Sequence, residues 1–359
     1  MNIGIIGPPL SGKTTTFHLL TGTKPNPSSA FKREMQTGVT FVPDFRVDKL
    51  AEISNSKKIT HTTVEYVDTP GIEPGAAKTD WFAAALSGGV KNSDGLLLVV
   101  RAFGEGEMSA GSNPERDVLA VQEELNFADL VVLENRLERM RKQRRVKAAT
   151  HEETVEMELL ERGKGFLESG RPLRLMPLEP HERKALRGFQ FLSAKPMLAV
   201  VNASDDKLHD VEKSLGTLND RLAGLQVHAI ALSAALEGEI ARLEGEEQAA
   251  FMSDLGVTEL ARDRVLKASY ELLGLITFLT TGEKESRAWP LRRGETAVDA
   301  AAEIHTDLAK GFIRAEVVHY DDLVREGGYP GCKAKGLLRL EGKEYIVKDG
   351  DVLVIRHSS

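Results

Sequence analysis

The chain has almost no cysteine: Cys332 is the only one among 359 residues. One thiol can neither close a disulfide within the chain nor supply the several thiolates of a cysteine metal cluster. The composition therefore excludes the disulfide-rich secreted class and cysteine-ligated zinc modules. It fits a reducing compartment, and we expect a cytoplasmic protein.

Long hydrophobic runs are also missing. No apolar stretch approaches the roughly 20 residues that a helix needs to cross a bilayer. The initial "NIGIIG" has only the length of a strand. It also lacks the charged and apolar regions of a secretory signal. We therefore expect no membrane association.

An excess of positive charge is absent as well, since 47 Lys and Arg face 54 Asp and Glu and leave a net charge of -7. This balance gives no global reason to expect nucleic-acid binding, although a local basic patch remains compatible with it. With 41% hydrophobic residues the chain can bury a sizeable core. Its length predicts two or three domains.

Directly after its first apolar run the chain carries "GPPLSGKT" (residues 7–14), which fits the phosphate-loop pattern GxxxxGK[ST]. Small residues let such a loop bend so that its backbone N–H groups point at a polyphosphate. We expect Lys13 to reach the β- and γ-phosphates and to act in catalysis. A plain strand-turn-helix with a surface lysine is disfavoured, because every required position is filled. The candidate phosphate ligands are Gly7, Leu10, Ser11, Gly12, Lys13, Thr14 and Thr15.

A second motif, "DTPG" (residues 68–71), follows the apolar stretch "VEYV". In a phosphate-loop nucleotidase, an aspartate here contacts Mg²⁺ through water, and the loop threonine supplies a hydroxyl ligand. We therefore predict a metal site at Thr14 and Asp68. The N–H of Gly71 is expected to sense the γ-phosphate, which makes Gly71 a second catalytic candidate. DxxG alone is a weak signal, but its distance behind the phosphate loop strengthens it.

Two further loops follow apolar strands at the places where such a domain holds a purine ring: "NASD" (202–205) and "SAA" (233–235). Guanine recognition usually needs an NKxD pattern, in which a lysine stem covers the base. Ala203 removes that lysine here, whereas Asp205 keeps the carboxylate. From the residues alone, ATP and GTP both remain open. The predicted base contacts are Asn202, Ala203, Asp205, Ser233 and Ala234.

Strand and helix signals alternate along much of the chain, which predicts an α/β fold with a mostly parallel sheet and helices on both faces. About ninety residues between Arg101 and Lys195 show helical spacing and almost no strand signal. We interpret them as an inserted antiparallel helical hairpin. The expected domains are a nucleotide-binding domain (1–104 and 191–277), the helical insertion (105–190) and a C-terminal domain (278–359).

The stretch "RLERMRKQRRVK" (136–147) near the turn of this hairpin holds seven basic residues and one acid. Such a tip can neutralise RNA phosphates, but it can equally be a solvated helix face, because no aromatic residues interleave as stacking platforms. The pattern does not decide between the two. The candidate RNA contacts, hereafter the basic tip, are Arg141, Lys142, Arg144, Arg145 and Lys147.

The order of these motifs, with "FQFLSAKP" and "SAALEGEIARL", resembles the YchF/Obg-like ATPase family over essentially the whole chain. The most specific parts are "YELLGLITFLTTGEKESRAWPLRRGETAVDAAAEIHTDLAKGFIRAEVVHYDDL" and "GKEYIVKDGDVLVIR". The resemblance implies a P-loop GTPase fold with a C-terminal TGS domain, a ubiquitin-like β-grasp module that binds RNA or ribosomal partners. The residues agree, with strand signals at 275–281, 286–291, 312–320 and 345–355 and a helix signal at 296–308. We expect His305 and Asp307 to serve a turn rather than a ligand.

Several positions depart from the family pattern and identify the chain as a divergent member. Leu10 replaces an asparagine that helps to bind potassium in related enzymes, so we expect no potassium stimulation by that route. Lys32 stands where the first switch supplies a Mg²⁺-binding threonine, and Thr37 and Thr40 are out of register. The second switch has Ile72 where Ras-like enzymes have a water-orienting glutamine. Ala77 stands where the family often has a histidine.

The resemblance implies a slow, Mg²⁺-dependent nucleotide switch coupled to ribosome or RNA association. The family's NxxE motif is associated with ATP, and Asp205 stands where that glutamate would be. Its carboxylate is one methylene shorter, which is compatible with guanine, as in NKxD, and with an adenine pocket. We favour ATP from the overall resemblance, with GTP close behind. The alternative is a nucleotide-binding regulator or scaffold with negligible hydrolysis. We expect a monomer.

Overall fold

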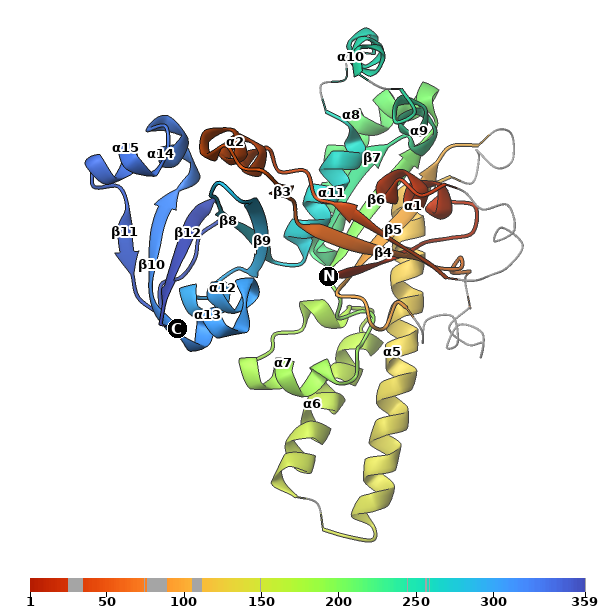
Figure 1. Cartoon of the computed structure of the whole chain (residues 1–359). Helices are drawn as coiled ribbons and strands as arrows, with labels where there is room; N and C mark the ends of the chain where they lie inside the picture. Colours follow the sequence, from red (N-terminus) through yellow and green to blue (C-terminus); the bar gives the residue numbers. More distant parts are fainter. Residues whose placement is uncertain are drawn as a thin grey trace. The chain divides into compact units, whose positions relative to one another are not determined.

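The computed structural model describes residues 1–24, 35–73, 75, 89–104, 112–148, 150–243, 245–255, 257 and 259–358. Lys32 and Ala77 lie outside these residues. The chain divides into two compact units (Figure 1). The first consists of Met1–Thr40 with Glu65–Val265, and the second of Phe41–Val64 with Leu266–Ser359.

The first unit is built on a six-stranded sheet in the order β2-β4-β1-β5-β6-β7. Its neighbouring pairs β1/β4, β1/β5, β5/β6 and β6/β7 are all parallel. The apolar run Leu96–Val100 is completely buried, as expected for a strand with both faces covered. The expected mostly parallel sheet is therefore confirmed. The strands are β1 (Asn2–Ile6), β2 (Gln36–Phe41), β4 (Thr63–Asp68), β5 (Gly95–Ala102), β6 (Met197–Ala203) and β7 (Val227–Leu232).

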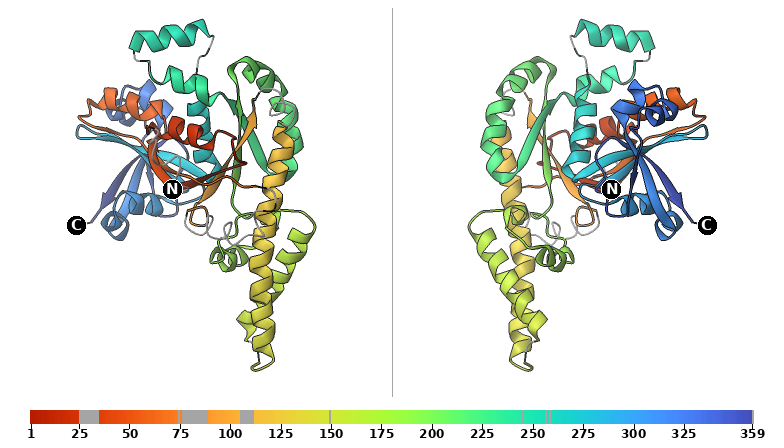
Figure 2. Two further views of the ribbon diagram at one scale, coloured as in Figure 1. Left: turned by 90° about the vertical axis from the view of Figure 1, so that its right-hand side faces the viewer. Right: turned by 90° about the vertical axis from the view of Figure 1, so that its left-hand side faces the viewer.

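Helices cover both faces of this sheet (Figure 2). On one face, Val121 of α5 and Leu215 of α8 pack against Leu98 and Val201 of the strands. Helix α1 packs with β1 and α9, and it ends at Gly22, which has a left-handed φ of 67°. Outside the hairpin, the described helices of this unit include α1 (Lys13–Thr21), α8 (Asp205–Leu222), α9 (Ala234–Ile240), α10 (Gly245–Asp254) and α11 (Ala261–Leu272), which passes into the second unit at Leu266.

The expected helical hairpin is formed by α5 (Pro114–Arg144) and α6 (His151–Glu168). Asn113 caps the start of α5, and Thr150 and Glu153 form a capping box at the start of α6. Leu133 of α5 and Leu160 of α6 lie in a separate core cluster. Because the first half of α5 packs on the sheet and its second half builds the hairpin, one continuous helix joins the two cores. The short helices η2 (Leu173–Leu175), α7 (Pro180–Arg187) and η3 (Ala223–Leu225) follow later in the chain.

A buried polar cluster fastens the base of the hairpin to the sheet. The Asp129 carboxylate on α5 accepts hydrogen bonds from the backbone N–H groups of Leu192 (2.9 Å) and Ser193 (2.7 Å), directly before β6. The Arg174 guanidinium donates to Gln122 Oε1 on the same helix (2.6 Å). Burial raises the pKa of Asp129 to about 6, against the opposing effect of the two N–H donors.

Asp129 predicts a pH dependence of stability. Its folded pKa of about 6 exceeds its usual value of 3.8, so the folded state binds the proton more tightly, and stability falls as the pH rises from about 4 to 6. Asp129→Asn should remove this pH dependence. The melting temperature of the variant, measured relative to that of the wild type, should therefore rise as the pH increases across that range. The exposed Asp220→Asn is the matched control. Parallel pH profiles for wild type and Asp129→Asn would contradict the prediction.

The second unit contains another six-stranded sheet, in the order β11-β10-β12-β8-β9-β3. Ala300 of α12 packs with Phe278 and Val317 in one cluster, while Leu50 of α2 and Leu323 of α14 pack with others in a second. The strands are β3 (Ile59–Thr60), β8 (Leu275–Thr280), β9 (Ser286–Arg292), β10 (Phe312–His319), β11 (Arg339–Glu341) and β12 (Asp351–His357). The helices are α2 (Phe45–Ser54), α12 (Ala297–Ile304), α13 (Thr306–Lys310), α14 (Tyr320–Arg325) and α15 (Tyr329–Ala334).

The strands expected near 275, 286 and 312 are confirmed, but the last strand begins later than predicted. Residues before Asp351 form a turn, in which the Asp351 side chain accepts from the Lys348 N–H (2.9 Å) and Gly350 has a φ of 82°. His305 accepts a hydrogen bond from the Asp307 N–H (3.2 Å) at the start of α13, so it serves the turn.

Among the helices of the described ranges, none combines the length and the low charge of a membrane span.

Candidate functional site

The predicted phosphate and base loops meet at one edge of the parallel sheet of the first unit. The phosphate loop follows β1, Asp68 ends β4, Asn202 lies near the end of β6, and Ser233 follows β7. Parallel strands bring their carboxyl ends to the same edge, which is where this class of fold binds ligands. The contacts confirm the convergence, because the Asn202 side chain donates to the Ser11 carbonyl oxygen (3.1 Å) across 191 residues of sequence.

The phosphate loop needs glycine at two positions for steric reasons. Gly7 has a φ of 149°, and a Cβ there would lie 2.2 Å from the Val99 carbonyl oxygen. Gly12 has a φ of 87°, and its Cβ would lie 2.2 Å from Nδ2 of Asn202. Any side chain would therefore push the loop away from β5 and β6. The small residues noted in the sequence are required by this close approach as well as by a phosphate ligand.

Lys13 begins helix α1, and its side chain turns back over the loop. Its ammonium group donates to the Pro8 carbonyl oxygen (2.8 Å), and the residue is only 8% exposed. Burial lowers the pKa of Lys13 to about 8, and the negative charge of Asp68 partly opposes that shift. A buried cation held by a neutral carbonyl is poorly compensated, so an incoming phosphate would stabilise it.

Thr14 and Asp68 form the second part of the site. The Thr14 hydroxyl donates to Asp68 Oδ2 (2.7 Å). Burial raises the pKa of Asp68, whereas Thr14 and Lys13 hold it down. Within the described ranges, the other carboxylate oxygen, Oδ1, is buried and has no hydrogen-bond partner. A hydroxyl and a buried carboxylate with an open oxygen are the hard ligands that fit Mg²⁺ and its water.

The "DTPG" segment lies directly on the phosphate loop. A Cβ at Gly71 would approach the Pro9 nitrogen to 2.9 Å, and the Ile72 N–H donates to the Gly7 carbonyl oxygen (2.9 Å). The Ile72 side chain is buried in the sheet core. A change at the phosphates can therefore reach this segment through the backbone, while Ile72 offers no polar group to a water molecule.

On the base side, three predicted residues bind each other or the backbone. Asn202 Oδ1 accepts from the Ala234 N–H (3.1 Å), so its amide bridges the phosphate loop and the 233–235 loop. Ser233 donates to Asp205 Oδ1 and accepts from the Leu236 N–H (3.3 Å). Asp205 itself is exposed, and its carboxylate is thus held in place at the surface.

The remaining predicted residues differ in accessibility. Thr14 and Thr15 are exposed, whereas Ala203 and Ala234 are buried. Leu10 is 72% exposed and has a left-handed φ of 59°. The buried Ser11 hydroxyl has no partner in the part of the chain that the structure describes.

Several groups around the phosphate loop were not predicted, because they leave a weak sequence pattern or none. Thr69 lies within "DTPG", and its buried hydroxyl donates to the Ile5 carbonyl oxygen (2.6 Å). The Pro8 and Val99 carbonyls are backbone groups, which leave no side-chain pattern. The Phe103 ring approaches Gly12, and its place just after β5 was the available sequence signal.

Comparison with protein families gives two matches. Residues 2–136 match the family model described as "50S ribosome-binding GTPase". Residues 275–358 match the model YchF-GTPase_C, described as "Protein of unknown function (DUF933)".

Relatives match over the full length. The chain is 37% identical to the ribosome-binding ATPase YchF of Bacillus subtilis, over 99% of each chain. It is 38% identical to the protein of that name from Haemophilus ducreyi, over 98% of each. The solved YchF GTPase of Schizosaccharomyces pombe superposes with a TM-score of 0.84 at 27% identity, covering 99% of this chain and 97% of that one. With its motifs and sheet order as described, this chain belongs to the YchF family.

Proposed function

We propose that the protein is a P-loop nucleotidase that binds a purine nucleoside triphosphate with Mg²⁺, hydrolyses it slowly and associates with the ribosome or RNA. The observation that carries the proposal is the convergence of the glycine loop, buried Lys13 and the Thr14–Asp68 pair at one sheet edge. The relatives named ribosome-binding ATPases support the same activity.

The residues divide the chemistry as follows. Lys13 and the loop N–H groups stabilise the charge on the phosphates, and Thr14 with Asp68 would hold Mg²⁺. Bound Mg²⁺ supplies further neutralisation of the phosphate charge. Gly71 contributes its N–H beside the γ-phosphate. Among the described residues Ile72 occupies the water-orienting position and is buried, which accounts for slow turnover.

ATP is the favoured nucleotide, and GTP is the second candidate. The names of the relatives support ATP. The exposed Asp205 carboxylate, held by Ser233, supports GTP, because a carboxylate can accept from guanine N1–H and the 2-amino group. The Asp205 side chain is one methylene shorter than the glutamate of the family's NxxE motif. The distance that its carboxylate reaches toward the base decides between adenine and guanine.

Calorimetric titration of the nucleotide-free protein tests the proposal directly. We expect the non-hydrolysable ATP analogue to bind about tenfold more tightly than the GTP analogue, a difference of about 1.4 kcal/mol. Both affinities should drop when Mg²⁺ is omitted. Tighter binding of the GTP analogue would identify the protein as a GTPase. If neither analogue binds, the proposed nucleotide site is refuted.

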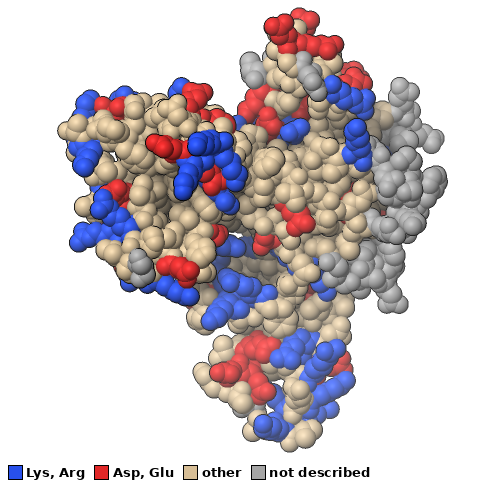
Figure 3. Space-filling view, viewed as in Figure 1, with Lys and Arg blue, Asp and Glu red and all other residues tan. Residues whose placement is uncertain are grey.

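The basic tip supports an RNA-binding role, but its five cations are not equivalent. Arg141 pairs with Glu161, and Lys142 pairs with Glu138. Arg144 donates to the Thr154 hydroxyl (3.0 Å). In the described part of the chain, the structure records no acidic partner for Arg144, Arg145 or Lys147, hereafter the loop cations. Basic side chains gather at this end of the hairpin (Figure 3).

Reversing the three loop cations to glutamate should weaken cosedimentation with ribosomes strongly at low salt. The salt dependence of RNA binding should also become shallower by about two units of log–log slope, because three phosphate contacts are lost. A control with the same charge change reverses Lys184, Lys213 and Arg242, which are exposed elsewhere in the first unit. Equal ribosome and RNA binding by the two triple variants would exclude the basic tip as the RNA-binding surface.

We propose the division of labour expected from the sequence, with nucleotide binding in 1–104 and 191–277, the hairpin in 105–190 and a TGS module in 278–359. Residues 41–64 and 266–277 are exceptions, because they belong to the second compact unit. The mixed sheet, with α12 and α14 packed in separate core clusters, and the C-terminal family match support the TGS module. We place the protein in the cytoplasm, because its single cysteine, Cys332, is buried as a free thiol, as expected in a reducing compartment.

A further inference from the structure

Residues 41–64 have an unusual place in the chain. They leave the sheet of the first unit after β2 and return to it in β4, whose last residue is Asp68. Between these strands they belong to the second compact unit. We call this segment the strap. It connects two neighbouring strands of the nucleotide-binding sheet and packs as part of the other unit.

The strap is a structural part of the second unit. Its β3 is the edge strand of that sheet and pairs in parallel with β9, Ile59 opposite Ser286. Val47 and Leu50 of α2 are completely buried in a core cluster with Leu279. The Ser56 hydroxyl donates to the Gly282 carbonyl oxygen (2.7 Å). The strap therefore cannot shift without disturbing this core.

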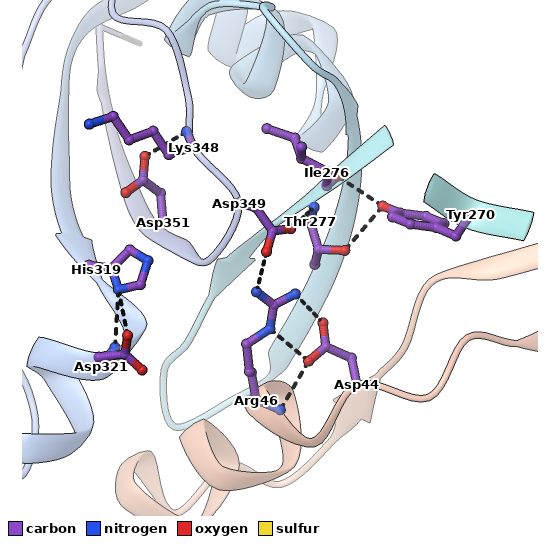
Figure 4. Close-up of polar contacts among 10 residues, drawn as sticks. All are labelled: Asp44, Arg46, Tyr270, Ile276, Thr277, His319, Asp321, Lys348, Asp349 and Asp351. Carbon is purple, nitrogen blue, oxygen red and sulfur yellow. Dashed lines mark hydrogen bonds and ion pairs between the residues drawn. The ribbon is translucent and has the colours of Figure 1, made fainter. Parts of the chain in front are cut away.

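A charged network fastens the start of the strap to strand β8 (Figure 4). Asp44 caps α2 and binds the Arg46 guanidinium through two bonds of 2.9 and 2.8 Å. The third guanidinium nitrogen donates to Asp349 Oδ2 (2.7 Å), and Asp349 Oδ1 accepts from the Thr277 N–H (2.8 Å). A Cβ at Gly350 would lie 3.2 Å from Arg46, so the glycine makes room for it.

We propose that the strap makes the second unit respond to the nucleotide state, with Arg46 as its fastening point; this inference rests on the nucleotide binding proposed above. Asp68 ends the strand into which the strap leads, so a movement of that strand on Mg²⁺-nucleotide binding pulls on the strap. Bistable elements transmit such shifts because packed cores do not deform continuously. By linkage, a ligand of the second unit must change nucleotide affinity by the same factor.

Hydrogen exchange on the full chain tests the coupling. With the Mg²⁺-bound non-hydrolysable ATP analogue, amide exchange should slow about fivefold or more in α2 and β8. Arg46→Ala should lose most of this response and change the dissociation constant of the analogue by a similar factor. The control, Lys49→Ala, lies on the same helix, and its side chain is half exposed and paired with Glu52. It should behave as the wild type.

Calorimetry on the same samples separates the outcomes. If the analogue binds but amide exchange in α2 and β8 is unchanged, the role proposed for the strap is overturned, while the proposed nucleotide binding stands. Absence of binding would overturn both proposals. If Arg46→Ala does not fold, Asp349→Asn replaces it, because an amide oxygen can still accept from Thr277 while the ion pair is lost. A full response in a folded Asp349→Asn protein would also overturn the role of this network.

Discussion

Lys13→Ala is expected to weaken binding of the triphosphate analogue about 100-fold, which corresponds to about 2.7 kcal/mol. The ammonium group is buried near Asp68, and among the described residues its recorded hydrogen bond goes to the neutral Pro8 carbonyl oxygen at 2.8 Å. A phosphate is the partner that would repay the cost of burying this charge. The measurement is calorimetric titration with the Mg²⁺-bound analogue, followed by single-turnover hydrolysis.

The same variant should not lower the melting temperature of the nucleotide-free protein. The pKa of Lys13 falls from 10.5 to about 8 in the folded state, so the buried charge opposes folding at neutral pH, and stability rises between about pH 8 and 10.5. If the melting temperature is unchanged as expected, a loss of binding in this variant is not due to unfolding.

Lys195→Ala is the matched control for Lys13. Its ammonium group is also partly buried and donates to carbonyl oxygens, those of Lys91 (2.9 Å) and Ser93. Lys195 lies two residues before β6, and Asn202 lies near the other end of that strand. Normal affinity in Lys13→Ala would refute the site. Wild-type hydrolysis no faster than in Lys13→Ala would favour the alternative of a regulator with negligible turnover.

Gly7→Ala is expected to destabilise the first unit by about 3–5 kcal/mol, the largest stability effect that we predict. The new methyl group would lie 2.2 Å from the Val99 carbonyl oxygen, a backbone atom inside the sheet that cannot move aside. The left-handed φ of 149° adds strain for any residue other than glycine. Thermal unfolding of the full chain should show a clear loss in the melting temperature of this unit.

Gly22→Ala provides the comparison that isolates the clash. Gly22 also has a positive φ, 67°, but a Cβ there would meet no atom within 4 Å. Its cost should be only about 1 kcal/mol, from backbone strain alone. Equal destabilisation by the two substitutions would show that the close approach of the loop to β5 does not matter.

Much of the nucleotide-binding unit could be predicted because its signals are local. The phosphate loop is defined by consecutive residues, and short apolar runs that contain β-branched residues, such as Leu96–Val100, favour buried strands. The hairpin follows from helical spacing in Leu133, Leu137 and Leu159. Each of these patterns reflects the periodicity of a single element, which needs no knowledge of what packs against it.

Contacts between distant segments could not be predicted in this way. The bridge of Asn202 between two loops and the clamp of Asp129 on Ser193 depend on which backbone groups arrive beside them. The start of the last strand was also misplaced, because the turn before Asp351 is decided by a side chain and by Gly350.

The sequence by itself determined the mostly parallel α/β sheet, the phosphate loop, the helical hairpin and the family, because these depend on spacing along the chain. Only the tertiary structure decided that residues 41–64 pack in the second unit, that Lys13 is buried against a carbonyl, and which cations of the basic tip are already paired. These features arise from burial and from partners far away in sequence. Their energies depend on desolvation and geometry, which a linear pattern does not contain.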